Sequence, residues 1–319
     1  MKKRSLLLGC ALTLTLSACE FSCAGHPTTP STPVPVFNEN LAWEQILEFE
    51  KIGPKIPGTQ GSLKGGDWIV SELKKAGVTV LEQKTEAKTF DGKTIPVRNI
   101  MGQINPGASE RYLLSAHWDS RPFSDEDPDP KFRSTPVPAT NDGGSGVVVL
   151  LGIAKALEGK KPSIGIDLLF LDAEDWGTPR DEESYCLGTQ YWAKNPVPAN
   201  YKAKYGINFD MVGRIGSIFP VEANTGRQAG DVIRKLQTSA RSLGYQDFFP
   251  NIQVGAIIDD HIYLMQGRNF PVADVIAMSP EGRFPPEWHT HKDTSEFISR
   301  DVLKVVGQTT LKTLWDEQH

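Results

Sequence analysis

The sequence predicts an α/β fold: a single globular domain with a central mixed, mostly parallel β-sheet flanked by helices. From residue 112 onward, short apolar runs suited to strands alternate with longer segments of helical periodicity. The run at 166–171 is almost wholly apolar, as in strands that are buried on both faces. The chain has 319 residues, of which 39% are hydrophobic, and no linker interrupts its middle. It is therefore long enough for one sizeable core, and a single large domain is expected.

The predicted elements can be placed along the chain by their periodicity. Helices are expected at 41–49, 62–75, 146–157, 185–194, 228–243 and 300–315. Strands are expected at 78–82, 97–104, 112–117, 166–172, 204–210 and 272–277, and Asp91-Gly92 is expected to form a hairpin turn between two early strands. In a mainly parallel sheet, ligands bind beyond the carboxyl ends of the strands. The Pro- and Asp-rich stretch 118–139 is then expected to be a loop over the site.

The N-terminus resembles a bacterial lipoprotein signal. A basic start and an apolar stretch lead to Leu16-Ser17-Ala18-Cys19, which predicts cleavage after residue 18 and lipid on Cys19. The alternative is an ordinary secretory signal that is cut at a small residue. Residues 19–37 are rich in Pro and Thr and are expected to form an extended tether, so the globular domain would comprise residues 38–319. We expect a protein of the bacterial cell envelope that faces the periplasm.

Charge and cysteine content restrict the partners. Residues 1–18 carry three positive charges and no negative ones, so their removal changes the formal charge from −5 to −8. Nucleic acid is an unsuitable partner for a chain this acidic that lacks a basic stripe. If Cys19 is acylated, Cys23 and Cys186 are the only cysteines left in the mature chain. Two cysteines are too few for a fold that depends on disulfides. Membrane contact is expected through the lipid only, and the protein is expected to be a monomer.

Five possible metal ligands occur along the chain, and most of them directly follow a predicted strand. They are His117, Asp142, Asp175, Asp210 and His289. A parallel sheet can bring such residues to one edge, and this mixture of histidine and carboxylate suits Zn²⁺. Glu174 precedes one of these candidates and is of the kind that moves protons beside a metal without binding it.

Each candidate also has a simpler structural explanation. Asp142 is at a helix start, where aspartate is favoured as an N-cap, and a histidine at a strand end is often only hydrogen-bonded. The adjacent acids Glu174 and Asp175 would be costly at a buried strand end unless a cation compensates them. His291 competes with His289 for the ligand role. In the segment 257–261, Asp259 is the acid of most interest, while its neighbours could cap the helix that begins there.

Taken together, the motifs HWDSRPF, NDGGSGV, LFLDAEDWG, SYCLGTQYWA, DDHIYL and FPPEWHT resemble those of the animal-type glutaminyl cyclases. The resemblance covers about residues 40–316, and the motifs occur in the family's order. It implies the fold of the M28 zinc aminopeptidases, with a mostly parallel six-stranded sheet. It also implies an enzyme that converts the N-terminal glutamine of peptides or proteins to pyroglutamate and releases ammonia.

The resemblance also assigns roles to individual residues. It implies one Zn²⁺ per chain, with Asp142, Asp175 and His289 as ligands and Glu174 as general acid and base. Asp210 and Asp259 would form a hydrogen-bonded acid pair near Glu174. The substrate pocket would be lined by Trp288, Phe284, Ile258 and, in place of an aromatic residue that the animal loop supplies later, Trp176. The chain departs from the animal pattern in having Asp175 where glutamate is usual.

Two other functions compete with this one. The first is a two-zinc aminopeptidase, because His117 and Asp210 are at positions where that class binds its second metal. The second is a lipid-tethered binding protein with a degenerate metal pocket, since a fold does not by itself determine an activity. The presence of Glu174 speaks against a protein that only binds.

Overall fold

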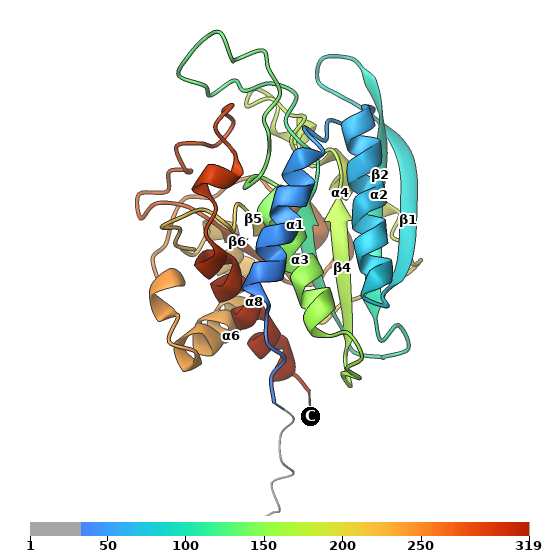
Figure 1. Cartoon of the computed structure of the whole chain (residues 1–319). Coiled ribbons are helices and arrows are strands. Elements are labelled where there is room, and N and C mark those ends of the chain that lie inside the picture. Colours follow the sequence, from blue (N-terminus) through green and yellow to red (C-terminus); the bar gives the residue numbers. More distant parts are fainter. Residues whose placement is uncertain (1–32, 319) are drawn as a thin grey trace, which may run out of the picture. The chain divides into compact units, whose positions relative to one another are not determined.

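A computed structural model describes residues 33–318 and contains a six-stranded sheet with the strand order β1-β2-β4-β3-β5-β6 (Figure 1). The strands are β1 (Thr79–Lys88), β2 (Thr94–Ile104), β3 (Arg111–His117), β4 (Gly165–Leu171), β5 (Tyr205–Asp210) and β6 (Val272–Ile276). Strands β4, β3, β5 and β6 are parallel, and the β1–β2 hairpin joins the edge of the sheet antiparallel to β4. The predicted mixed, mostly parallel sheet is confirmed.

The hairpin is longer than the sequence pattern indicated. The predicted turn at Asp91-Gly92 is present, and Gly92 adopts a positive φ of 82° that favours glycine. Both strands extend further toward this turn than predicted: residues 83–88 pair with residues 94–99. Half of the side chains in 83–88 face solvent. A polar strand of this kind carries little apolar periodicity from which it could be recognised.

Helices cover both faces of the sheet. They are α1 (Glu39–Lys51), α2 (Gln60–Lys75), α3 (Gly144–Ala156), α4 (Leu187–Lys194), α5 (Ala223–Gln228), α6 (Gly230–Ser242), α7 (Asp260–Arg268) and α8 (Arg300–Trp315). One face packs against α1, α2, α3, α6 and α8, and the other against α4 and α7. In Figure 1, α1, α2 and α3 lie in front of the sheet and α4 behind it.

The two cores follow from the alternation of side chains along each strand. In β3, Leu114 faces the larger helical layer, whereas Leu113 faces α4 and α7. The central strand β4 is buried along its whole length, as its apolar run predicted. Helices on both faces of a parallel sheet leave the carboxyl ends of the strands free for a site, and the loops that follow β3, β4, β5 and β6 meet there.

The last residues before α1 belong to this domain. Phe37 is fully buried, its N–H donates to Gln308 Oε1 at 2.9 Å, and its ring lies against Gly152 and Gly307. Residues 34–37 therefore pack with the domain, whereas the tether had been expected to extend to residue 37. The predicted signal and most of the tether lie outside the described residues. Within residues 33–318, no helix is both long enough and apolar enough to cross a membrane.

Candidate active site

The predicted site residues converge at the carboxyl edge of the sheet. His117 ends β3, Asp210 ends β5, and Glu174 and Asp175 follow β4. Asp142 comes from the loop that leads into α3. His289 comes from the loop after β6, where it has a positive φ of 53°. These segments are far apart in the sequence and adjacent in space because parallel strands end at the same edge.

Asp142, Asp175 and His289 form a compact group of buried ligand atoms, all within 4.8 Å of one another. His289 Nε2 lies 3.1 Å from Asp175 Oδ1 and 3.6 Å from Asp142 Oδ2. The Oδ2 atoms of both aspartates are buried and have no hydrogen-bond partner in the described part of the protein. Buried carboxylate oxygens are costly when left unpaired, and a cation would satisfy them. The donor set fits Zn²⁺.

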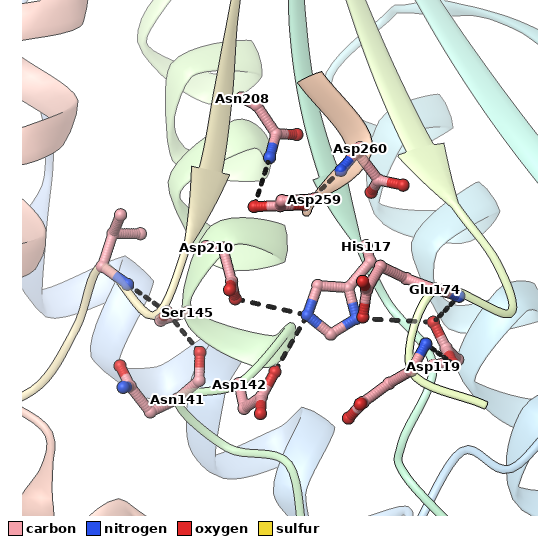
Figure 2. A network of polar contacts seen from close by, with 12 residues as sticks. His117, Asp119, Asn141, Asp142, Ser145, Glu174, Asn208, Asp210, Asp259 and Asp260 are labelled. Carbon is pink, nitrogen blue, oxygen red and sulfur yellow. Dashed lines mark hydrogen bonds and ion pairs between the residues drawn. The ribbon is translucent and has the colours of Figure 1, made fainter. Parts of the chain in front are cut away.

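His117 connects this group to a second one. Its Nε2 lies 3.0 Å from Asp142 Oδ1 and 3.3 Å from Asp210 Oδ1, and its Nδ1 lies 3.4 Å from Asp119 Oδ1. Figure 2 shows the imidazole between Asp119 on one side and Asp142 and Asp210 on the other. His117, Asp142 and Asp210 also satisfy the distance requirement for holding an ion. Asp142 is therefore common to both groups.

Asp119 holds the loop that follows β4. Its two carboxylate oxygens accept hydrogen bonds from the backbone N–H groups of Glu174 at 3.0 Å and Asp175 at 3.2 Å. This fixes the chain where Ala173 turns through a positive φ of 56°. Arg121, from the predicted loop over the site, donates to the Asp175 backbone oxygen at 2.8 Å. The loop 118–139 thus lies beside the site, and it holds the backbone of Glu174 and Asp175 in place.

Glu174 lies beside the metal-type group and has its own partners. Cys186 Sγ lies 3.3 Å from Glu174 Oε1, and Cys186 itself is buried and not in a disulfide. Burial, reinforced by Asp175 and opposed by the nearby His117, holds the pKa of Glu174 well above its usual range. A carboxyl group whose pKa is raised by burial is suited to both taking and giving a proton.

Burial and crowding of like charges disturb the other acids too. Burial and the charges of Asp175 and Asp210 raise the pKa of Asp142 to about 6, against the lowering effect of His117. Burial likewise raises the pKa of Asp210. Asp175 is the exception: in spite of burial, His289 and Arg121 hold its pKa below the usual value. This excess of buried negative charge is what a divalent cation would neutralise.

A cavity of about 270 Å³ opens over these residues. Its apolar wall includes Phe284 and Trp288, whose ring centroids are 4.6 Å apart, and Ile258. The Trp288 ring also stacks on His289 at 3.8 Å. Its remaining lining residues are Asp142, Glu174, Asp175, Pro179, Glu182, Tyr185, Asp210, Met211, Ile257, Asp259, Ile276 and His289.

One predicted pocket residue is elsewhere. Trp176 is not among the residues that line this cavity. It packs with Ile95, Val97 and Ala173 against the hairpin. In its place Tyr185 contributes an aromatic ring, with Met211 and Ile257 completing the wall. Periodicity placed Tyr185 at the start of a predicted helix at 185–194, but α4 begins at Leu187 and Tyr185 lies in the preceding loop, as Met211 and Ile257 lie in loops of their own.

The expected hydrogen bond between Asp210 and Asp259 is replaced by bonds to other partners. Asp259 Oδ2 accepts from Asn208 Nδ2 at 3.1 Å, and the same side chain caps α7 through the Asp260 N–H. Asn208 Nδ2 also lies 3.2 Å from Asp274 Oδ1. The two acids face the same cavity and influence each other through charge, because Asp259 raises the pKa of Asp210. Asn208, for which no sequence pattern indicates a role, positions Asp259.

The choice between the two histidines of the EWHTH segment is clear in the structure. His289 faces Asp142 and Asp175, whereas His291 pairs with Asp127 and stacks on the Phe132 ring at 3.7 Å. His291 thus ties the loop over the site to the loop after β6. Asp293, two residues further, accepts the N–H groups of Asn141 at 2.8 Å and Asp142 at 3.0 Å and so holds the ligand loop.

Comparison with known proteins agrees with this geometry. A model of peptidase family M28 matches residues 99–314. The chain is similar to a Zn-dependent exopeptidase from Parabacteroides distasonis (45% identity, TM-score 0.87, covering 89% of this chain and 100% of that one). It is also similar to the glutaminyl cyclase of Tannerella forsythia (42% identity, TM-score 0.87, with the same coverage). Over 299 residues it is 24% identical to the glutaminyl-peptide cyclotransferase of Gloydius blomhoffii, covering 83% of this chain and 78% of that protein. The chain belongs to peptidase family M28 and has the fold of the bacterial glutaminyl cyclases.

Proposed function

We propose that this protein is a glutaminyl-peptide cyclotransferase, an acyltransferase that converts the N-terminal glutamine of peptides or proteins to pyroglutamate and releases ammonia. The observation that carries the proposal is the position of Glu174. Its carboxyl group has a raised pKa and lines a small cavity between a metal-type ligand group and the aromatic wall of Phe284 and Trp288. Relatives of the chain named as glutaminyl cyclases support the choice of reaction.

The proposed cofactor is one Zn²⁺ per chain, held by Asp142, Asp175 and His289. When bound, the ion supplies a Lewis acid that polarises the γ-carbonyl group of the glutamine. Arg121 and Asp293 would keep two of the ligands in place, since they hold the backbone at Asp175 and Asp142. The raised pKa of Asp142 suits this role, because an ion would restore its charged form.

The proton transfers are assigned to Glu174. Its carboxylate takes a proton from the α-ammonium group, which leaves a neutral amine able to attack the γ-carbonyl carbon. A bond forms between the α-nitrogen and this carbon, and the α-nitrogen, which then carries two hydrogens, releases one proton to solvent. The bond between the carbon and the amide nitrogen breaks, and Glu174 returns its proton to that nitrogen, which leaves as ammonia. Asp259 lines the same cavity and would attract the α-ammonium group of the substrate. The wall of Phe284, Trp288 and Ile258 would hold the glutamine side chain in the folded conformer that cyclisation requires.

The direct test is the release of ammonia from Gln-β-naphthylamide and from a Gln-initiated peptide by the purified protein with zinc. Ammonia release and a blocked N-terminus in the product are expected. If free β-naphthylamine appeared in place of ammonia, the reaction would be amide hydrolysis, and the proposal would fail.

The second candidate, a two-zinc aminopeptidase, is favoured by one observation. His117, Asp142 and Asp210 form another ligand group that shares Asp142 with the first, as a bridging carboxylate would require. An aminopeptidase would hydrolyse Leu-p-nitroanilide or Ala-p-nitroanilide, which a cyclase cannot use. Turnover of these anilides together with two bound ions would favour the aminopeptidase.

We also propose that the enzyme is attached to the bacterial cell envelope by lipid on Cys19, faces the periplasm and acts as a monomer on exported peptides or proteins. The motif at residues 16–19 supports the anchor. A Cys19→Ala variant is expected to lose metabolically incorporated palmitate and to move from the membrane to the soluble fraction. Cleavage of the wild-type protein by protease added to spheroplasts would test its orientation.

A further inference from the structure

A second cavity, of about 260 Å³, lies next to the first. Phe284 is the one residue that lines both of them. The second cavity is built from the segment that follows β5 and the segment that follows β6. Its lining residues are Arg214, Gly216, Ser217, Ile218, Ala277, Met278, Ser279, Pro280, Arg283, Phe284, Pro285 and Pro286. The proposed reaction uses none of these residues except Phe284.

The walls of this cavity are mainly apolar. Ile218, Met278 and Ala277, together with the three prolines and Phe284, are seven of its twelve lining residues. The Arg214 guanidinium is already held by Glu287, with contacts of 2.6 and 3.2 Å, so it shapes the wall and is not free for a ligand. Arg283 has a side chain that is 74% exposed and pairs with the exposed Glu281, a surface contact of little strength.

Ser217 adds a polar group to the same wall. The residue is only 7% exposed, and its hydroxyl group has no hydrogen-bond partner in the described part of the protein. Buried hydroxyl groups are nearly always bonded. Rotation about its χ1 angle would turn this donor toward the cavity, where a backbone carbonyl group of a bound chain could accept its proton.

We infer that the second cavity is the subsite for the residues that follow the N-terminal residue of the substrate, and that it takes an extended peptide segment with apolar side chains. The occupant follows from continuity. Phe284 lines both cavities, so a chain whose N-terminal residue occupies the first cavity enters the second by passing this one aromatic ring. An extended chain advances about 3.3 Å per residue, which carries its second or third residue beyond one aromatic ring. This inference rests on the proposed function only in requiring a substrate with a free N-terminus.

Measuring the binding affinity of peptides tests the subsite independently of the cyclisation reaction. Zinc-loaded Glu174→Gln protein, in which turnover is expected to be about 10²- to 10⁴-fold slower, is titrated calorimetrically with Gln-Leu-Leu-amide and with Gln-Ser-Ser-amide. We expect the leucine peptide to bind about tenfold more tightly, because its side chains are buried against Ile218 and Met278. In the same background, Ile218→Asp should abolish this preference. The matched control is Ile215→Asp, which changes a nearby isoleucine that is 53% exposed and does not line the cavity.

A second, milder variant tests the subsite in case Ile218→Asp does not fold. Met278→Ala should reduce the preference by about threefold while its thermal midpoint stays within a few degrees of the parent protein. Equal affinity for the two peptides, or a preference that survives both Ile218→Asp and Met278→Ala, would overturn the subsite. If the wild-type enzyme released no ammonia from any Gln peptide but the affinity pattern persisted, the subsite would stand and the cyclase proposal alone would fall.

Discussion

The buried charge of Asp142 should make the metal-free protein less stable as the pH rises. Burial raises the pKa of this carboxyl group from 3.8 to about 6. A group whose pKa is higher in the folded state than in the unfolded state contributes stability below the unfolded value, and this stability is lost as the pH rises through the folded value. The window therefore runs from about pH 4 to about pH 6. A shift of about two units corresponds to roughly 3 kcal/mol of lost stability at neutral pH.

The perturbation that isolates this effect is Asp142→Asn, studied by denaturant unfolding in the presence of a strong chelator. At pH 7 the chelated variant is expected to be more stable than the chelated wild-type protein by up to about 3 kcal/mol, because the amide carries no charge to bury. Near pH 4 the two proteins should differ little. Added zinc should reverse the order at pH 7, since it stabilises only the protein that retains the ligand.

The matched control is Asp247→Asn, which removes an exposed aspartate and should leave the pH dependence unchanged. Comparison of two chelated proteins cancels the contribution of other buried acids, such as Asp260, whose burial raises its pKa to about 8. If chelated wild-type protein and Asp142→Asn lost stability in parallel between pH 4 and pH 7, the buried charge of Asp142 would not be the cause, and the argument for a cation at this site would be refuted.

Four further predictions concern the reaction, the metal content, the domain boundary and the core around Phe37. Glu174→Gln should keep its zinc and fold but lose activity by about 10²- to 10⁴-fold, the range typical of general acid and base catalysis; a rate above about a tenth of wild type would contradict its role. Elemental analysis should find one zinc per chain, and His117→Ala should keep it, whereas two ions, one of them lost in this variant, would favour the aminopeptidase. Deletion of residues 1–36 should leave a soluble, active enzyme, and insolubility would place the boundary elsewhere. Phe37→Ala should cost about 3–5 kcal/mol in unfolding free energy, against almost nothing for Phe90→Ala, whose side chain is 43% exposed.

Much of the fold could be predicted from the sequence because its signals are local. Apolar runs such as that of β4, amphipathic periodicity in α2 and the Asp91-Gly92 turn each depend on residues close together in the chain. The location of the site could be predicted from the same local signals, because parallel strands have their carboxyl ends at the same edge of the sheet. The alternation of elements thus determined the sheet and brought His117 and Asp210 to one edge of it.

Only the tertiary structure decided which of these side chains meet and what surrounds them. His289 and His291 are two residues apart, yet one faces Asp175 and the other Asp127. The Trp176 ring turns to the hairpin and leaves the cavity wall to Tyr185, a direction that the loop sequence does not encode. The physical reason is common to these cases. The conformation of a loop, and the burial that raises the pKa of Glu174, are set by packing between segments far apart in the chain, which no local pattern contains.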